Sequence, residues 1–165
     1  MDQFELEFIP IRKTLDENKE FAIHPDCKES LSMTIDYYDK IGFEIPWIGY
    51  YACIDNVLVG SAGFKGKPVN GRVEIAYGTF PRFRKRGVGT AICKRMVQLS
   101  LITDPTIRIC ARTLAEENYS SKILKKNNFK LLGTVVDEED GEVWEWEYSK
   151  AVARKSGIYF VAGSG

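Results

Sequence analysis

A strand-like stretch runs directly into a glycine-bearing helix start at residues 80–96, which read FPRFRKRGVGTAICKRM. The basic residues Arg82, Arg84, Lys85 and Arg86 precede the glycines Gly87 and Gly89. The start of a helix presents unpaired backbone N–H groups and the positive end of the helix dipole. Glycine lets an anion approach that backbone closely, and flanking cations add charge-assisted hydrogen bonds. The junction therefore predicts a phosphate or pyrophosphate site.

A plainer interpretation of the same stretch is a helix start beside a solvated basic surface. Two well-known phosphate motifs do not fit it. A Walker loop ends in Gly-Lys-Ser/Thr, and the dinucleotide fingerprint G-x-G-x-x-G would need glycine where Ile92 stands. Nucleoside triphosphates and dinucleotides are therefore disfavoured as ligands.

Periodicity and turn signals around this junction predict a mixed sheet flanked by helices. Alternating or β-rich runs predict strands over residues 4–9, 47–54, 57–64, 72–80, 106–111, 129–137 and 142–148. Helical spacing predicts helices over residues 26–41, after Gly87, and over 115–127. Asp55 and Asn56 form a two-residue hairpin turn, so an antiparallel meander leads into a β-α-β unit. The fold class expected is α+β, with about seven strands in one mixed sheet.

Composition restricts the partners and the compartment of the chain. Its 165 residues suit one domain, and 23 Lys plus Arg equal 23 Asp plus Glu, so no overall field favours nucleic acid or an anionic membrane. No basic and apolar leader opens the chain, and no apolar run approaches the roughly 20 residues of a membrane span. The four cysteines are widely spaced and form no C-x-x-C pair, so we expect buried thiols and no metal site. These features indicate a cytoplasmic protein.

The pattern Arg84-x-x-Gly87-x-Gly89 between a strand and a helix resembles the signature of the GNAT superfamily of acyl-CoA N-acyltransferases. Pro81 and Phe83 resemble its lead-in. Residues 111–129, ARTLAEENYSSKILKKNNF, resemble the second cofactor-side helix, with matches at Glu117, Asn118, Ser120, Leu124, Lys126 and Phe129. The last two strands resemble the terminal hairpin of members related to bacterial ribosomal-protein amino-terminal acetyltransferases. The resemblance covers residues 47–148 and departs at Asn128, where the family usually has glycine.

The resemblance implies a GNAT-like domain over residues 1–150 and a tail, 151–165, that falls outside it. It also implies acetyl-CoA as the co-substrate. The backbone that would cradle its pyrophosphate is that of Arg84, Lys85, Arg86, Gly87, Val88, Gly89 and Thr90. Asn118 and Ser120 would lie near the pantetheine arm and the thioester. Thr79 would lie where its strand parts from the next parallel strand.

The chemistry of amine acetylation then asks for a base. A side-chain amine with a pKa of about 10.4 is less than roughly 0.1% neutral at pH 7, whereas an α-amine is on the order of 10% neutral. Glu74 is the predicted base, because alternation places it on one strand face with the small residues Ala76 and Gly78. Many GNAT members have a glutamate on this strand. The alternative is an ordinary solvated or salt-bridged glutamate.

The second chemical task is protonation of the leaving thiolate. Many family members use a tyrosine on the second cofactor-side helix, but Leu124 and Lys125 stand where it would be expected. Ser120 is the remaining candidate. A thiol with a pKa near about 8.5 leaves tolerably as the thiolate, so a dedicated acid is optional.

The predicted function is transfer of an acetyl group from acetyl-CoA to a primary amine, by direct attack in a ternary complex. The amine would belong to a small molecule or to a peptide or protein amino terminus. We expect the acceptor groove near residues 26–47 and 137–148, and a monomer or homodimer. A non-catalytic acyl-CoA sensor on the same fold stays open. A nucleic-acid backbone patch at residues 82–86 is a weaker alternative.

Overall fold

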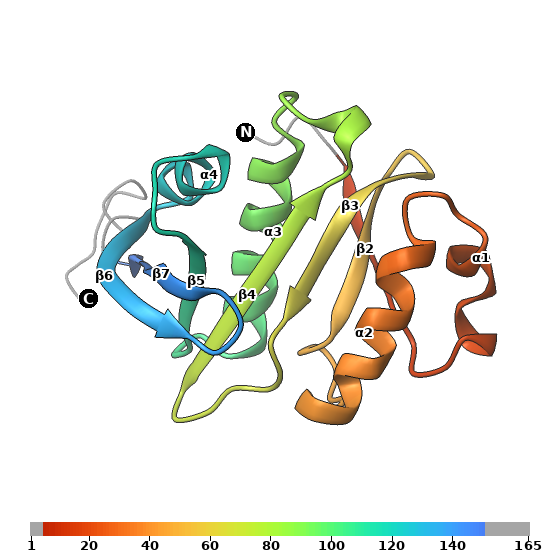
Figure 1. The fold of residues 1–165 in the computed structure, drawn as a ribbon, viewed down its shortest axis with the longest axis horizontal. Helices are drawn as coiled ribbons and strands as arrows, with labels where there is room; N and C mark the ends of the chain where they lie inside the picture. Colours follow the sequence, from red (N-terminus) through yellow and green to blue (C-terminus); the bar gives the residue numbers. More distant parts are fainter. Residues whose placement is uncertain (1–4, 151–165) are drawn as a thin grey trace.

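The computed structural model describes residues 5–150 of the chain, and the sequence-defined tail of residues 151–165 lies outside them. A seven-stranded sheet of order β1-β2-β3-β4-β5-β7-β6 forms its centre (Figure 1). Only β4 and β5 are parallel; all other neighbours are antiparallel. The strands are β1 (Leu6–Pro10), β2 (Gly49–Ile54), β3 (Val57–Phe64), β4 (Arg72–Thr79), β5 (Arg108–Leu114), β6 (Phe129–Asp137) and β7 (Gly141–Tyr148). The predicted α+β fold with a mixed sheet is confirmed.

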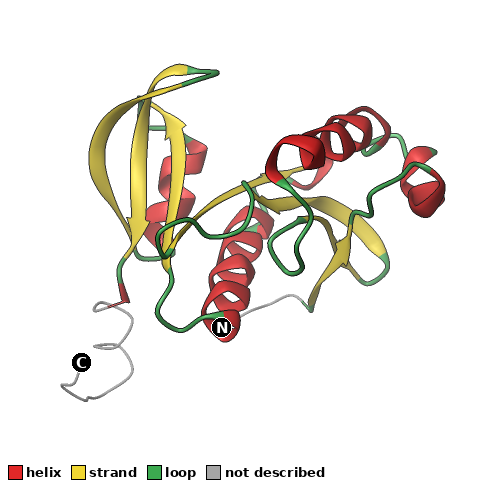
Figure 2. Cartoon of the chain, turned by 90° about the horizontal axis from the view of Figure 1, so that it is seen from below, coloured by secondary structure: helices red, strands yellow, loops and turns green. Residues whose placement is uncertain are grey.

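Helices cover both faces of this sheet. They are α1 (Lys19–Ala22), α2 (Lys28–Ile41), α3 (Val88–Thr103) and α4 (Tyr119–Lys126), with 3-10 turns at Asp16–Asn18 and Pro81–Phe83. Figure 2 shows α2 and α3 on opposite sides of the sheet. Helix α4 packs against α3 and β6. Within residues 5–150, no helix is long and apolar enough to cross a bilayer.

Two element boundaries differ from the sequence prediction, and each has a local cause. The helix predicted from residue 115 begins only at Tyr119, because the preceding Asn118 is extended and caps it. The strand predicted from residue 106 begins at Arg108, since the Asp104 carboxylate accepts hydrogen bonds from the backbone and hydroxyl of Thr106 and holds a turn there. The predicted two-residue turn is confirmed, with positive φ at Asp55 (51°) and Asn56 (65°).

The alternation predicted along β4 also holds. Val73 and Ile75 are buried, whereas Ala76 is exposed and Glu74 half-buried. Helix α3 packs against β3 and β4, and its buried Ile92 and other apolar residues share one core with Val73 and Ile75. Glu74 and Ala76 therefore face the other side of the sheet, the side on which α2 lies.

The parallel strands β4 and β5 separate along their length. Their pairing runs only from Arg72 opposite Arg108 to Ile75 opposite Ala111. Beyond that point β4 stays with β3, and β5 stays with β7. The carboxyl-terminal halves of these two parallel strands therefore lie apart, as Figure 1 shows, and this separation of the strands is called the opening below.

One edge of β4 faces this opening. The carbonyl oxygen of Glu74 accepts a hydrogen bond from the N–H of Lys65 at 2.9 Å, so the even-numbered residues of β4 direct their backbone groups toward β3. The backbone groups of Tyr77 and Thr79 point the opposite way, into the opening. The predicted position of Thr79 at a split between parallel strands is thus the one observed.

Candidate active site

The start of α3 is an uncapped helix end at the mouth of the opening. Its N-cap is Gly87, at φ +82°, a left-handed conformation that favours glycine. No side chain caps this end. The three basic residues before it, Arg84, Lys85 and Arg86, are exposed. The first N–H groups of α3 and these cations can therefore receive an anion, which fits the predicted pyrophosphate site.

The basic residues of this loop differ in the contacts that their side chains make. Arg82 is ion-paired with Asp26 at 2.8 Å, and the guanidinium groups of Arg82 and Arg86 both lie over the ring of Phe83. Arg84 donates from Nε to the carbonyl oxygen of Thr79 at 3.4 Å. Arg82 therefore connects the loop to the segment before α2, and the other cations remain at the helix start.

Gly89 is buried for a reason that the sequence did not reveal. A Cβ at this position would lie 2.7 Å from Cδ1 of Ile123 and 3.1 Å from Oγ1 of Thr79. Only glycine lets α3 approach α4 and the end of β4 this closely. A side chain at Gly89 would thus disturb helix packing first, and its predicted part in a phosphate cradle stays a prediction.

The start of α4, by contrast, is closed by its own side chains. Oδ1 of Asn118 accepts a hydrogen bond from the N–H of Ser121, and the N–H of Asn118 donates to Oγ of Ser121, both at 2.9 Å. This reciprocal pair is a capping box. Ser121 is buried and Ser120 is exposed. The sequence reasoning missed Ser121, although the spacing Asn-x-x-Ser indicates such a cap.

Replacing Asn118 by alanine should lower stability by about 0.5–2 kcal/mol through the lost cap. If Asn118 also contacts pantetheine, its alanine variant should in addition lose acetyl-CoA affinity. Ser121→Ala is the matched control, because it breaks the same capping box and leaves the Asn118 amide in place. Melting temperatures and acetyl-CoA calorimetry distinguish helix capping from cofactor contact. Both variants and Ser120→Ala are measured. Equal affinities throughout would leave Asn118 with the cap alone and remove Ser120 from the cofactor site.

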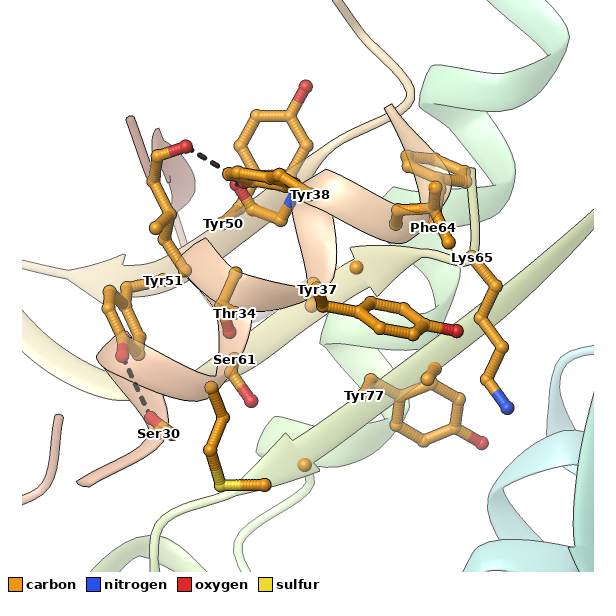
Figure 3. A pocket seen from close by; sticks show the side chains of 18 of the residues that line it. Ser30, Thr34, Tyr37, Tyr38, Tyr50, Tyr51, Ser61, Phe64, Lys65 and Tyr77 are labelled. Carbon is orange, nitrogen blue, oxygen red and sulfur yellow. Dashed lines mark hydrogen bonds between the residues drawn. The ribbon is translucent and has the colours of Figure 1, made fainter. Parts of the chain in front are cut away.

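A pocket of about 440 Å³ lies on the other face of the sheet, between α2 and the β6–β7 turn. Its floor comes from β3 and β4, including Ser61, Gly63, Ala76 and Gly78. Its walls include Met33, Thr34, Tyr37 and Tyr38 of α2, with Phe64, Lys65 and Glu139. Figure 3 shows the ring of Tyr37 extending from α2 toward Lys65. A pocket therefore lies where the acceptor groove is predicted, between the amino-terminal helix region and the last hairpin.

Glu74, the predicted base, is engaged in an ion pair at the edge of this pocket. Nζ of Lys65 lies 2.9 Å from Oε2 of Glu74. Burial lowers the pKa of Lys65, but the hydrogen bond and charge of Glu74 outweigh burial, so the pKa is raised. Lys65 lines the pocket and Glu74 does not. An acceptor amine would therefore reach Glu74 past Lys65 or through a water molecule.

Further charged side chains continue this pair across the sheet face. Glu145 pairs with Arg72 at 2.8 Å and with Arg112 at 3.3 Å, and Arg112 pairs with Asp137 at 2.8 Å. Since Arg72 is on β4 and Glu145 on β7, the network spans β5 and holds the strands together where they still pair. Within residues 5–150, no cluster of His, Cys, Asp or Glu resembles a metal site.

Asp137 fixes the turn that carries Glu139 to the pocket. Its Oδ2 accepts hydrogen bonds from the N–H groups of Glu139 and Asp140, at 3.0 and 3.2 Å. The Glu139 bond, then the Arg112 guanidinium, lower the pKa of Asp137 to about 2. The acidic turn of the sequence is thus an ordered part of the pocket wall.

Asp137→Asn should lower the melting temperature most at neutral pH. The folded-state pKa lies below the ordinary value of about 3.9, so the ionised carboxylate stabilises the fold above that value. This contribution should fade as pH falls from about 4 toward 2. Thermal melts across that range test it, with Glu138→Gln as a control that removes a charge from the same turn without these bonds. A difference between variant and wild type that is independent of pH would contradict the assignment.

Comparison with known proteins fits this geometry. The chain matches the family described as acetyltransferase (GNAT) domain over residues 8–130. No curated protein sequence matches it significantly. Since the family match spans most of the chain, the chain belongs to the GNAT acetyltransferase family. The predicted enzyme class, an acetyltransferase of the GNAT family, is confirmed.

Solved structures share the fold at low identity. RimL, the ribosomal L7/L12 alpha-N-protein acetyltransferase in complex with coenzyme A, is 13% identical with a TM-score of 0.63, over 88% of this chain and 94% of that one. A spermidine N-acetyltransferase SpeG chimera from Vibrio cholerae and hSSAT is 13% identical with a TM-score of 0.64, over 92% and 98%. The aminoglycoside acetyltransferase AAC(6')-Ib with coenzyme A is 17% identical with a TM-score of 0.63, over 92% and 98%. At these identities the likeness establishes the fold.

Proposed function

We propose that the protein acetylates a primary amine by direct attack of the amine on acetyl-CoA in a ternary complex. The observation that carries this proposal is that β4 borders both the pocket and the opening. Ala76 and Gly78 line the pocket, while the backbone of Tyr77 and Thr79 faces the opening toward β5. An amine in the pocket and a thioester in the opening would therefore meet across one strand.

The chain's own groups fit coenzyme A along this opening. Arg84, Lys85, Arg86 and the N–H groups of Gly87, Val88, Gly89 and Thr90 would bind the pyrophosphate. Backbone groups of Tyr77 and Thr79 would pair with pantetheine amides as another strand would. A backbone N–H on this edge would stabilise the charge that develops on the thioester oxygen. When bound, acetyl-CoA supplies the electrophilic carbonyl and a thiolate leaving group.

Proton transfers fall to the residues near β4 and α4. Glu74 would take the proton from an acceptor amine of high pKa, directly or through water. Ser120, at the exposed first turn of α4, is the proposed proton donor to the sulfur. Leu124 is buried and Lys125 is ion-paired with Glu117 at 2.9 Å, so neither replaces the tyrosine of other family members.

Two solution properties complete the proposal. The four cysteines are buried and unpaired, which suits a reducing compartment, and we place the protein in the cytoplasm. We propose a monomer or homodimer whose partner is the amine acceptor, with no nucleic acid and no membrane involved.

A thiol-release assay with acetyl-CoA across small amines, polyamines, aminoglycosides and peptides with free amino termini tests the function. We expect amine-dependent release of coenzyme A above the rate of hydrolysis. Acetyl-CoA binding by calorimetry without amine-dependent release would instead favour the non-catalytic sensor. Binding to DNA or RNA that collapses between low and moderate salt would favour the backbone patch.

A further inference from the structure

The acceptor pocket has mainly aromatic and aliphatic walls. Met33, Tyr37 and Ile41 come from α2, one helix turn apart. Met33 keeps 71% of its surface exposed, and Tyr37 is half-buried. Apolar surface left open inside a concave site gains most from a ligand that buries it.

Most tyrosine hydroxyls of the pocket are already used by the protein. The hydroxyl of Tyr38 donates to the carbonyl oxygen of Ile11 at 2.8 Å, and that of Tyr50 donates to Pro46 at 2.6 Å. The hydroxyl of Tyr51 lies 2.8 Å from that of Ser30, as Figure 3 shows for this pair. These three rings are almost fully buried, so their hydroxyls are not available to a ligand.

The hydroxyls that remain for a ligand are few. Thr34, Tyr37 and Ser61 line the pocket, and none of their hydroxyls has a hydrogen-bond partner among residues 5–150. They lie on α2 and β3, on two sides of the cavity. They suit a ligand with one or two polar atoms.

Charge in the pocket wall is also sparse. Among the described lining residues, Glu139 is the one carboxylate and Lys65 the one cation. The Lys65 ammonium is paired with Glu74, and its raised pKa keeps it protonated at neutral pH. A ligand with several ammonium groups would need a partner for each one that leaves water, and Glu139 can serve one of them.

We infer that the acceptor is a small primary amine with a single cationic centre and an aromatic or branched apolar body, rather than a polycation. The body would lie against Met33, Tyr37 and Ile41. Glu139, held by the Asp137 turn, would attract the ammonium form before the amine is deprotonated at the floor. This inference rests on the proposed function and specifies its substrate class.

The first test compares phenethylamine and tyramine with putrescine, spermidine and kanamycin as acceptors, at saturating acetyl-CoA. We expect kcat/KM for the aromatic monoamines to exceed that for the polycations by at least about tenfold. Calorimetry with phenethylamine gives a readout independent of turnover. Polycations that are turned over better than the monoamines would overturn the inference and leave the proposed function standing.

Variants of the pocket form the second test. Tyr37→Ala should raise KM for phenethylamine about tenfold and leave KM for acetyl-CoA unchanged, since it removes one apolar wall. Tyr37→Phe should keep KM for phenethylamine near the wild-type value. Asp39→Ala, at an exposed position of the same helix outside the pocket, is the matched control. Glu139→Gln should raise KM for phenethylamine with little change in kcat.

The outcomes distinguish a failure of the proposed function from a failure of the inferred substrate class. If acetyl-CoA binds and no amine of any class releases coenzyme A, the proposed function and this inference both fail. If amines are acetylated but Tyr37→Ala and Asp39→Ala behave alike, the function stands and the substrate class is wrong. Selective loss of phenethylamine turnover in Tyr37→Ala, with rescue in Tyr37→Phe, supports both.

Discussion

Glu74→Gln is expected to lower kcat/KM for a high-pKa amine by about 10² to 10⁴ at pH 7, the usual contribution of a general base. Glutamine keeps the size of the side chain and cannot accept the proton. Because the neutral fraction of the amine grows with pH, the deficit should shrink as pH rises toward the amine's pKa. An α-amine acceptor, already partly neutral at pH 7, should show a smaller deficit.

A structural role for Glu74 gives a different result. The substitution also removes the ion-pair partner of Lys65, so the melting temperature should fall whichever role is correct. The pH–rate profile distinguishes them, because a positional defect lowers the rate at every pH by a similar factor. Glu7→Gln, the same chemical change at an exposed position of β1, is the control. An unchanged profile in Glu74→Gln would remove Glu74 as the base.

Local signals in the sequence were enough to predict the sheet and the junction at its centre. The Asp55–Asn56 turn fixes the hairpin register, and the alternation of Val73 and Ile75 with Glu74 fixes which face of β4 is buried. Both depend on residues next to each other in the chain. The family resemblance added what those signals lack, namely a predicted place for a co-substrate at the split between β4 and β5.

The pocket that we propose as the acceptor site was harder to predict, because its parts are far apart in the sequence. Tyr37, Lys65 and Glu139 meet in one pocket only after β4 has brought the α2 region and the β6–β7 turn together. The ion pair that engages Glu74 also depends on strand register, since Lys65 follows β3 and faces Glu74 across the meander. Residue type at position 74 cannot reveal such a partner.

Gly89→Ala should lower acetyl-CoA affinity by about tenfold or more and destabilise the fold by about 1–3 kcal/mol, the usual cost of overpacking. The added Cβ would lie 2.7 Å from Cδ1 of Ile123, closer than real Cβ contacts, so the Ile123 side chain must turn or α4 must move away from α3. That movement would alter the end of β4, because Thr79 contacts the same position. Calorimetry with acetyl-CoA and a thermal melt measure the two effects.

A double variant separates packing from direct contact with phosphate. Ile123→Val removes the Cδ1 atom that the new Cβ would meet, so Gly89→Ala combined with Ile123→Val should recover most of the lost stability. Ile123→Val alone should cost only about 0.5–1.5 kcal/mol and supplies the matched control. If affinity recovers together with stability, Gly89 serves the site by letting α3 and α4 approach. If stability recovers and affinity does not, the methyl group at position 89 interferes with the pyrophosphate itself, and an affinity unchanged in Gly89→Ala would place coenzyme A away from the start of α3.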